Sequence, residues 1–286
     1  MLSVGGTLMT SVEQKRAAFR ALHAQGCFIL PNPWDAGSAR MLQSLGFQAL
    51  ASTSAGFAWT TGQPDYRVSR AAVIGHLALM CSVVDLPVNA DFESGFAATP
   101  EGVAESVRLV IEAGVAGLSI EDRDLGRGGL YGTQAAIERL GAARDAIAAS
   151  GADVMLVART ELLLSEPDEI SRAIDSLVAF AQAGADCLYA PGVRKRADIA
   201  AMARAVAPKP LNVLAIDPSM TLAELRDLGV RRISVGGALA PGRGTHPGQQ
   251  VGVRHQFVVA QPRIRAPAMR HLAGEGEPEP GVEVAR

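Results

Sequence analysis

The sequence has few cysteines, few lysines and few aromatic residues. Three of its 286 residues are cysteines, Cys27, Cys81 and Cys187, and each lies in an apolar run. Their separation excludes the close spacing of a structural metal site, and so few cysteines cannot make a disulfide framework. We therefore expect free, buried thiols in a reducing compartment, and hence a cytoplasmic protein.

The sequence also lacks an excess of charge of one sign and any long apolar run. The formal net charge is −2, so nothing in the balance indicates nucleic acid or an anionic membrane as a partner. No apolar run reaches the length of a membrane span. Met1–Met9 lacks the basic start and apolar core of a signal peptide. We expect residues 1–10 to be a flexible leader, with Met9 as an alternative start to Met1.

Short apolar runs alternate with amphipathic segments along most of the chain. After a first helix expected at 11–25, eight runs have the length of strands. They are Cys27–Leu30, Ala49–Ser52, Leu86–Ala90, Gly117–Ile120, Val154–Ala158, Cys187–Ala190, Leu211–Leu214 and Arg232–Val235. Seven helical segments follow them, near 36–46, 69–84, 99–113, 133–150, 168–183, 194–206 and 221–228.

Eight successive strand and helix units predict an α/β protein with a (β/α)8 TIM barrel over residues 11–240. A doubly wound open sheet is the alternative, but it usually has fewer strands and a glycine-rich loop after the first one. Here that turn is Pro31–Asp35, which has no glycine. In a barrel, all strands end on the face that carries the chemistry, so polar residues at the strand ends are expected to gather there.

The third strand runs into two carboxylates, Asp91 and Glu93. On an extended chain, residues two apart point to the same side, so both can aim at one point beyond the strand. Two carboxylates suit a hard cation such as Mg²⁺. A strand running out into a polar turn is the alternative.

Other strand ends add to this set. The second strand ends in Ser52–Gly56, whose hydroxyls and backbone amides suit a carboxylate, and Asp65 lies in the loop that follows. The fourth strand ends in Glu121-Asp122 and the fifth in Arg159. A lone arginine at a strand end can be a structural ion pair. Acids on the third and fourth strands beside an arginine on the fifth indicate a cation site next to an anion site.

These motifs resemble the isocitrate lyase/phosphoenolpyruvate mutase superfamily over roughly residues 19–240. The resemblance is carried, in chain order, by Ala51-Ser52-Thr53-Ser54-Ala55-Gly56, Gly62-Gln63-Pro64-Asp65, Asp91-Phe92-Glu93-Ser94-Gly95, Ser119-Ile120-Glu121-Asp122 and Val157-Ala158-Arg159-Thr160-Glu161. It implies that Asp91, Glu93 and Glu121 hold Mg²⁺, partly through water, with Asp65 close by.

The resemblance also implies the roles of the remaining site residues. Thr53, Ser54 and Ala55 would hold the substrate carboxylate, and Arg159 would bind the other anionic group. Arg159, Asp65 and Glu121 are the expected catalytic residues. The family is commonly oligomeric, so a homo-oligomer is expected here too.

Three departures from the family pattern qualify this expectation. The second metal acid is Glu93 where Asp is usual, and its extra methylene shifts the ion or favours contact through water. The loop after Glu121-Asp122, residues 122–132, lacks the cysteine and histidine of the lyase branch. Its four glycines indicate a lid, although a solvated, mobile loop without a catalytic role is the alternative. The third departure is the segment after Ala240, which matches nothing in the family.

We therefore expect a Mg²⁺-dependent enzyme of the phosphoenolpyruvate mutase-like branch. It would break or form a C–C or P–C bond in a small 2-oxo acid or phosphonate, through an enolate. Oxaloacetate-type decarboxylation is as compatible with the sequence as P–C chemistry. A second hypothesis is an inactive barrel that binds a small dicarboxylate or a metal.

The segment 241–286 changes character abruptly. It is rich in proline, glycine and arginine and has no sustained helical period, a composition typical of disorder. We expect it to replace the last barrel helix with an irregular tail, and so to weaken an oligomer. An altered reading frame near codon 240 would explain the change.

Overall fold

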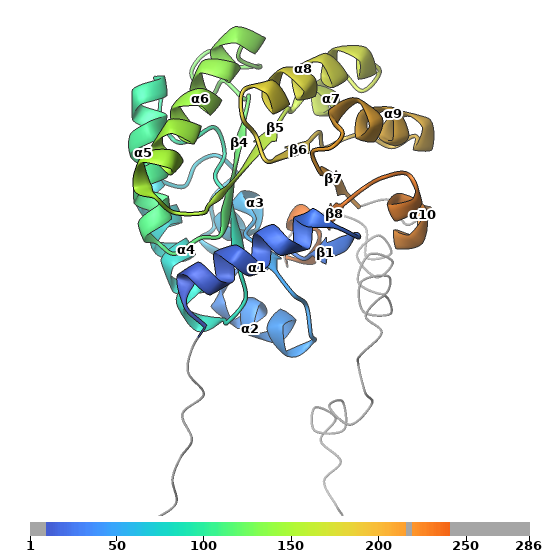
Figure 1. Cartoon of the computed structure of the whole chain (residues 1–286). Helices are drawn as coiled ribbons and strands as arrows, with labels where there is room; N and C mark the ends of the chain where they lie inside the picture. Colours follow the sequence, from blue (N-terminus) through green and yellow to red (C-terminus); the bar gives the residue numbers. More distant parts are fainter. Residues whose placement is uncertain (1–9, 216–218, 241–286) are drawn as a thin grey trace, which may run out of the picture.

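The computed structural model describes residues 10–215 and 219–240 of the chain. Eight parallel strands form one sheet in which the strands from β2 to β8 pair in chain order, and β1 pairs with β8 (Figure 1). The strands are β1 (Phe28–Leu30), β2 (Leu50–Ala51), β3 (Val88–Asp91), β4 (Gly117–Glu121), β5 (Met155–Arg159), β6 (Cys187–Tyr189), β7 (Leu211–Leu214) and β8 (Arg232–Ser234). The predicted TIM barrel is confirmed. Residues 1–9 of the predicted leader and the predicted tail lie outside the described residues, whereas Thr10 N donates to Asp85 Oδ1 at 3.0 Å.

Helices surround the strands (Figure 1). They are α1 (Val12–Ala24), α2 (Ala36–Ser44), α3 (Ser54–Thr60), α4 (Arg70–Val83), α5 (Pro100–Glu112), α6 (Thr133–Ser150), α7 (Leu162–Ser165), α8 (Ile170–Gln182), α9 (Arg196–Val206) and α10 (Leu222–Asp227), with a 3₁₀ turn at Gly236–Leu239. The short helices α3 and α7 were not predicted. Both follow strand ends on the face expected to carry the chemistry. No helix in the described part of the chain is both long and apolar enough to cross a membrane.

Helix α1 covers the opposite end of the barrel, where the strands begin. Ser11 caps it through a hydrogen bond that Gln14 N donates to the serine hydroxyl. Phe19 is fully buried and packs with Phe28, Ala116 and Met155, which lie at the starts of their strands. The same cluster includes Ala49 and Ala51, so the apolar floor of the barrel is built from α1 and from residues in or just before β1, β2, β4 and β5. All three cysteines are free, and Cys81 and Cys187 are buried as expected, but the expectation was wrong for Cys27, which is only partly buried.

His23 lies in this floor between two aromatic rings. Its ring makes edge contacts with Phe19 and Phe28, and its Nε2 atom has no hydrogen-bond partner. Burial, and next the charge of Arg232, lower the pKa of His23 from 6.5 to about 3. His23 is therefore neutral in the folded protein and acts as a packing residue.

The stability of the fold is expected to fall as the pH drops below 6.5. In that range the unfolded chain binds a proton at His23 that the folded chain does not bind. For this one group, the free energy of unfolding therefore falls by about 1.4 kcal/mol for each unit by which the pH is lowered. The loss continues until the pH approaches the folded pKa of about 3. Urea unfolding of wild type and His23→Leu at several pH values measures the difference. If the free energy of unfolding had the same slope against pH in the two proteins, the lowered pKa of His23 in the folded protein would be contradicted.

Asn32 joins three strand ends where the barrel closes. Its Nδ2 donates to the Ser52 carbonyl at 2.8 Å, and its Oδ1 accepts from the amides of Val235 and Gly236 at 2.9 Å each. In the described chain β1 and β2 share no strand ladder, but Ala51 N donates to the Pro31 carbonyl at 3.0 Å. The buried Asn32 amide thus completes the closure with side-chain hydrogen bonds.

Asn32→Ala is expected to lower the free energy of unfolding by about 2–4 kcal/mol, because three buried backbone groups lose their partners. Urea unfolding checks this value. Ser44→Ala is the control, since the Ser44 hydroxyl makes only an exposed bond to the Met41 carbonyl and its loss should change stability by less than about 0.5 kcal/mol. A similar small change for Asn32→Ala would show that water replaces the lost bonds.

Candidate active site

The structure brings three of the predicted site residues into direct contact. Asp91 ends β3, Glu121 ends β4 and Arg159 ends β5, and the register pairs Glu121 with Arg159. Arg159 Nη1 lies 3.4 Å from Asp91 Oδ1, and Arg159 Nε lies 3.5 Å from Glu121 Oε2. Arg159 Nε also donates to Glu161, a residue of the fifth motif to which the sequence assigned no role.

The charges of these carboxylates keep the guanidinium of Arg159 protonated. Burial alone lowers the pKa of the guanidinium, but the charges of Glu161, Glu121 and Asp91 outweigh it and hold the pKa well above its usual value. The ring of Tyr189 on β6 lies 5.2 Å from the guanidinium carbon. Arg159 is therefore a permanent cation with its Nε and Nη1 atoms directed at acids.

Asp91 is also bound by the residues that follow β2. Ser54 N donates to Asp91 Oδ2 at 3.0 Å, and Asp91 N donates to the Ser52 hydroxyl at 2.8 Å. The Thr53 hydroxyl accepts from Gly56 N at 3.1 Å and so caps α3. The segment 52–56, whose backbone amides were expected to suit a substrate carboxylate, therefore contains a helix start, and the first amide of that helix is directed at Asp91. Ala55 lies in the first turn of α3.

Glu93 lies near the same acids, but not for the reason predicted. Strand β3 ends at Asp91, and Glu93 has a left-handed backbone with φ of 47°, so the alternation of an extended chain does not apply to it. Burial first, and then the charges of Asp91 and Asp65, raise the pKa of Glu93 to about 8. Burial and the charge of Asp91 also raise the pKa of Asp65. The predicted acids therefore repel one another across the site.

Glu121 is the most enclosed of these acids. It is 3% exposed, and its Oε1 atom has no hydrogen-bond partner, nor has Oε2 of Glu161. Burial raises the pKa of Glu121 well above its usual value, while Arg159 and a side-chain hydrogen bond with Tyr66 oppose the rise. A buried, unpartnered carboxylate oxygen is costly unless a cation or a proton meets it.

The acids fit a cation that keeps much of its own water. In the described ranges no three acidic, histidine or cysteine side chains are gathered closely enough to form a metal-binding group. The donors are nevertheless carboxylate oxygens, they repel one another, and Glu121 Oε1 is unpartnered. Mg²⁺ usually takes one or two protein carboxylates and fills its other positions with water or substrate. The residues present therefore fit Mg²⁺ better than a metal held by a full protein cage.

Tyr66 is a site residue that the sequence did not indicate. Its backbone is left-handed, with φ of 63°, which is uncommon for a residue with a side chain. Burial and the charges of Glu121 and Glu161 raise the pKa of its hydroxyl above the usual value. The guanidinium carbon of Arg123 lies 4.7 Å from the centre of its ring. Only its place directly after Asp65 could have drawn attention to it.

The loop 122–132 is folded and lies between two cavities. Arg123 and Leu130 form an antiparallel bridge, and Asp124 Oδ1 accepts from the amides of Gly126 and Arg127 at 3.0 and 3.1 Å. A cavity of about 510 Å³ separates the loop from α7 and α8. A second cavity, of about 550 Å³, lies between the loop and residues 94–98. Movement of this loop as a lid stays a prediction.

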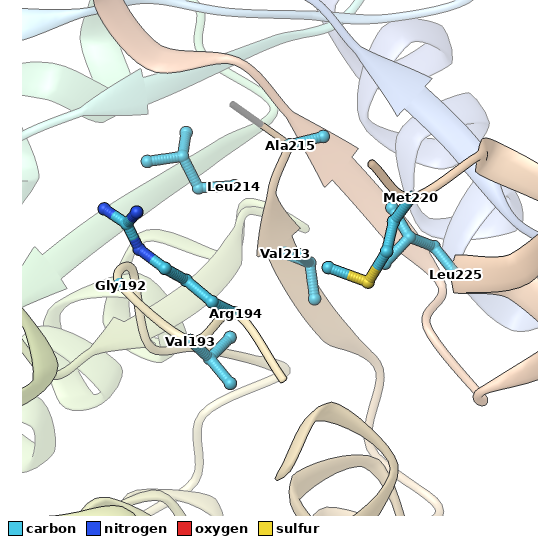
Figure 2. Close-up of a pocket in the computed structure, with 8 residues that line it drawn as sticks. All are labelled: Gly192, Val193, Arg194, Val213, Leu214, Ala215, Met220 and Leu225. Carbon is cyan, nitrogen blue, oxygen red and sulfur yellow. The ribbon is translucent and has the colours of Figure 1, made fainter. Parts of the chain in front are cut away.

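A smaller cavity lies at the ends of β6 and β7. It has a volume of about 20 Å³, which is room for about one water molecule. Figure 2 shows Arg194 on one side of it and Met220 and Leu225 on the other, with Val213 between them. Its size and its apolar lining make it a packing gap, not a site for a charged substrate.

The chain is similar to known enzymes over most of its length. Residues 19–242 match the phosphoenolpyruvate phosphomutase family. A solved structure from Burkholderia cenocepacia J2315, provisionally described as a lyase/mutase, is 47% identical, with a TM-score of 0.77 over 80% of this chain and 84% of that one. The 2-methylisocitrate lyase of Escherichia coli is 30% identical over 65% of each chain. The oxaloacetate decarboxylase of Paraburkholderia xenovorans is 28% identical over 70% of this chain and 68% of its own. Together with the barrel and the motifs at its strand ends, the match shows that the chain belongs to the phosphoenolpyruvate phosphomutase family, within the isocitrate lyase/phosphoenolpyruvate mutase superfamily of lyases and mutases.

Proposed function

We propose that this chain is a Mg²⁺-dependent enzyme that breaks or forms a C–C or P–C bond in a small 2-oxo acid or phosphonate, through an enolate. The observation that carries the proposal is the group of mutually repelling acids at the ends of β3 and β4, with the unpartnered Oε1 of Glu121 beside Arg159. Such a group is costly unless a cation neutralises it. The family match, and the similarity to a 2-methylisocitrate lyase, support a lyase or mutase.

In this proposal Asp91, Glu93 and Glu121 hold the ion, partly through water. Mg²⁺ bound there would supply a Lewis acid that favours the enolate form of a 2-oxo acid. Asp65, whose pKa is raised by burial and by Asp91, orients water or substrate at the edge of this group.

The remaining residues orient the substrate. We assign its carboxylate to Thr53, Ser54 and Ala55, the residues that join β2 to α3. Arg159 has its Nε and Nη1 atoms directed at acids, so the planar guanidinium offers its remaining N–H groups to the second anionic group of the substrate. Tyr66 and Tyr189, which flank these charges, restrict water.

Two reactions remain distinct candidates within this proposal. P–C chemistry is favoured by the family match. Decarboxylation of an oxaloacetate-type acid is favoured by the relative that is an oxaloacetate decarboxylase. The enolate left by the loss of CO2 would take its proton from water, because the loop 122–132 has neither cysteine nor histidine to donate one. An inactive barrel that binds a dicarboxylate is the alternative to both.

A panel of 2-oxo, 2-hydroxy and phosphono acids, assayed with Mg²⁺ and again with EDTA, tests the proposal. We expect turnover of at least one acid with Mg²⁺ and none with EDTA. Binding of several acids without turnover of any would support the inactive barrel. Turnover that is unchanged by EDTA would contradict the role given to the acids.

A further inference from the structure

The backbone that carries Glu93 is strained. Glu93 and Phe96 both have left-handed backbones, with φ of 47° and 54°, and Gly95 between them has φ of 85°. Residues with side chains adopt this conformation rarely and at a cost in free energy. Such a segment persists only where its surroundings hold it in place. The structure therefore has to contain a group that fixes the residues after β3.

That group is Arg139 of α6. Its Nη2 donates to the carbonyls of Ser94 and Ala97 at 2.5 and 2.7 Å, and its Nη1 donates to the carbonyl of Ala98 at 3.1 Å. The side chain is 2% exposed. It makes no ion pair with any residue that the structure describes. A buried cation is costly without a carboxylate paired to it, and Arg139 Nε has no hydrogen-bond partner. The three carbonyls therefore compensate for part of the cost of burying Arg139.

The same guanidinium contacts the end of the loop 122–132. The guanidinium carbon of Arg139 lies 4.3 Å from the centre of the Tyr131 ring, a distance at which the cation and the ring attract each other. Tyr131 N donates to the Asp122 carbonyl at 2.7 Å, which fixes this end of the loop beside the end of β4. Arg139 thus has the Glu93 segment on one side and the 122–132 loop on the other.

We propose that Arg139 is a positioning residue that holds the Glu93 backbone in its left-handed conformation and couples it, through Tyr131, to the 122–132 loop. The inference rests on the proposed role of Glu93 in binding Mg²⁺. It gives the loop an effect on the metal site without any residue of the loop contacting the ion. If the loop moves and takes Tyr131 away from Arg139, then Arg139, and with it the Glu93 segment, is held less firmly.

Four variants test this proposal. Arg139→Lys keeps the charge but loses the fork that spans three carbonyls. Tyr131→Leu removes the ring, whereas Tyr131→Phe keeps it. Arg16→Lys is the matched control, because Arg16 is a buried arginine that also binds only carbonyls, those of Val115 and Ile111, next to the start of β4 at the other end of the barrel. Calorimetric titration with Mg²⁺ in the presence of oxalate, thermal unfolding and hydrogen exchange of residues 93–98 are measured for each.

We expect Arg139→Lys to weaken Mg²⁺ binding about ten- to hundred-fold, the effect typical of groups that orient a metal ligand, and to speed exchange of residues 93–98. Tyr131→Leu should change both in the same direction by less, and Tyr131→Phe should match the wild type. Arg16→Lys should lower the melting temperature and leave Mg²⁺ affinity within about two-fold, because it leaves the supporting groups of the metal ligands intact.

Unchanged Mg²⁺ affinity in a folded Arg139→Lys protein would overturn the positioning role and leave the proposed function standing. Tyr131→Leu with wild-type exchange at 93–98 would overturn the coupling to the loop. Absence of Mg²⁺ binding by the wild type would overturn the proposed function, and with it the role of Arg139 toward the ion.

Discussion

Replacing Asp91 with alanine is expected to abolish Mg²⁺-dependent turnover and to weaken Mg²⁺ binding by more than about a hundred-fold. That factor is the upper end of the effect of groups that only orient a metal ligand, and the loss of a ligand itself should exceed it. Asp91 interacts electrostatically with both other proposed ligands, Glu93 and Glu121. It contacts Arg159 through Oδ1, it accepts from Ser54 N through Oδ2, and its charge raises the pKa of both Glu93 and Asp65. Its removal therefore takes away one proposed ligand, one of the three carboxylates that contact Arg159, and the acceptor of Ser54 N at the start of α3.

Two further variants separate these effects. Asp91→Asn keeps an oxygen for Ser54 N but loses the charge, so it should lose metal affinity to a similar extent while keeping α3 in place. Asp153→Ala, at the other end of the barrel and paired with Arg20 on the surface, should leave metal affinity unchanged. The site lies above the apolar core, so the free energy of unfolding should change little in Asp91→Asn. Wild-type Mg²⁺ affinity of Asp91→Ala, measured by titration calorimetry, would exclude Asp91 as a ligand.

The barrel could be predicted from the sequence because its determinants are local. Each of the eight apolar runs overlaps a strand of the sheet, and three strands extend one residue beyond their run, to Asp91, Glu121 and Arg159. The runs could be found because buried parallel strands are short, continuously apolar and separated by amphipathic helices. Helix α3 was missed because Ser52–Gly56 has the composition of a loop. It forms a helix because the Thr53 hydroxyl accepts from Gly56 N, which is a cap and not a property of composition.

The site could be predicted only in part, for a physical reason. Asp91, Glu121 and Arg159 meet because neighbouring parallel strands end at the same edge, so their proximity followed once the fold was known. Tyr66 and Arg139 lie near the site through contacts between elements distant in the sequence, and no periodicity marks them. The left-handed backbone of Glu93 was not predicted either, because the alternation rule assumes that the strand continues.

Replacing Arg159 with lysine is expected to lower kcat/KM. The fall should correspond to a loss of about 2–4 kcal/mol of transition-state stabilisation, as for the loss of other fixed electrostatic contacts. Arg159 contacts Asp91, Glu121 and Glu161 at once and stacks near Tyr189. A lysine ammonium is a point charge on a flexible stem and cannot span three carboxylates in one plane. Glu121, whose pKa burial raises and Arg159 holds down, would then be protonated more readily and would bind a cation less well.

The control for Arg159→Lys is Arg20→Lys. Arg20 also contacts two carboxylates, those of Asp153 and Asp186, but it is partly exposed and lies at the other end of the barrel. Its replacement should leave kcat/KM unchanged and alter stability by less than about 1 kcal/mol. For Arg159→Lys, a rise in KM at constant kcat would assign the guanidinium to substrate binding alone, whereas a fall in kcat would assign it to the transition state. Equal kcat/KM for wild type and Arg159→Lys would show that Arg159 only balances the charge of the three acids, because a lysine can supply that charge but not the planar fork.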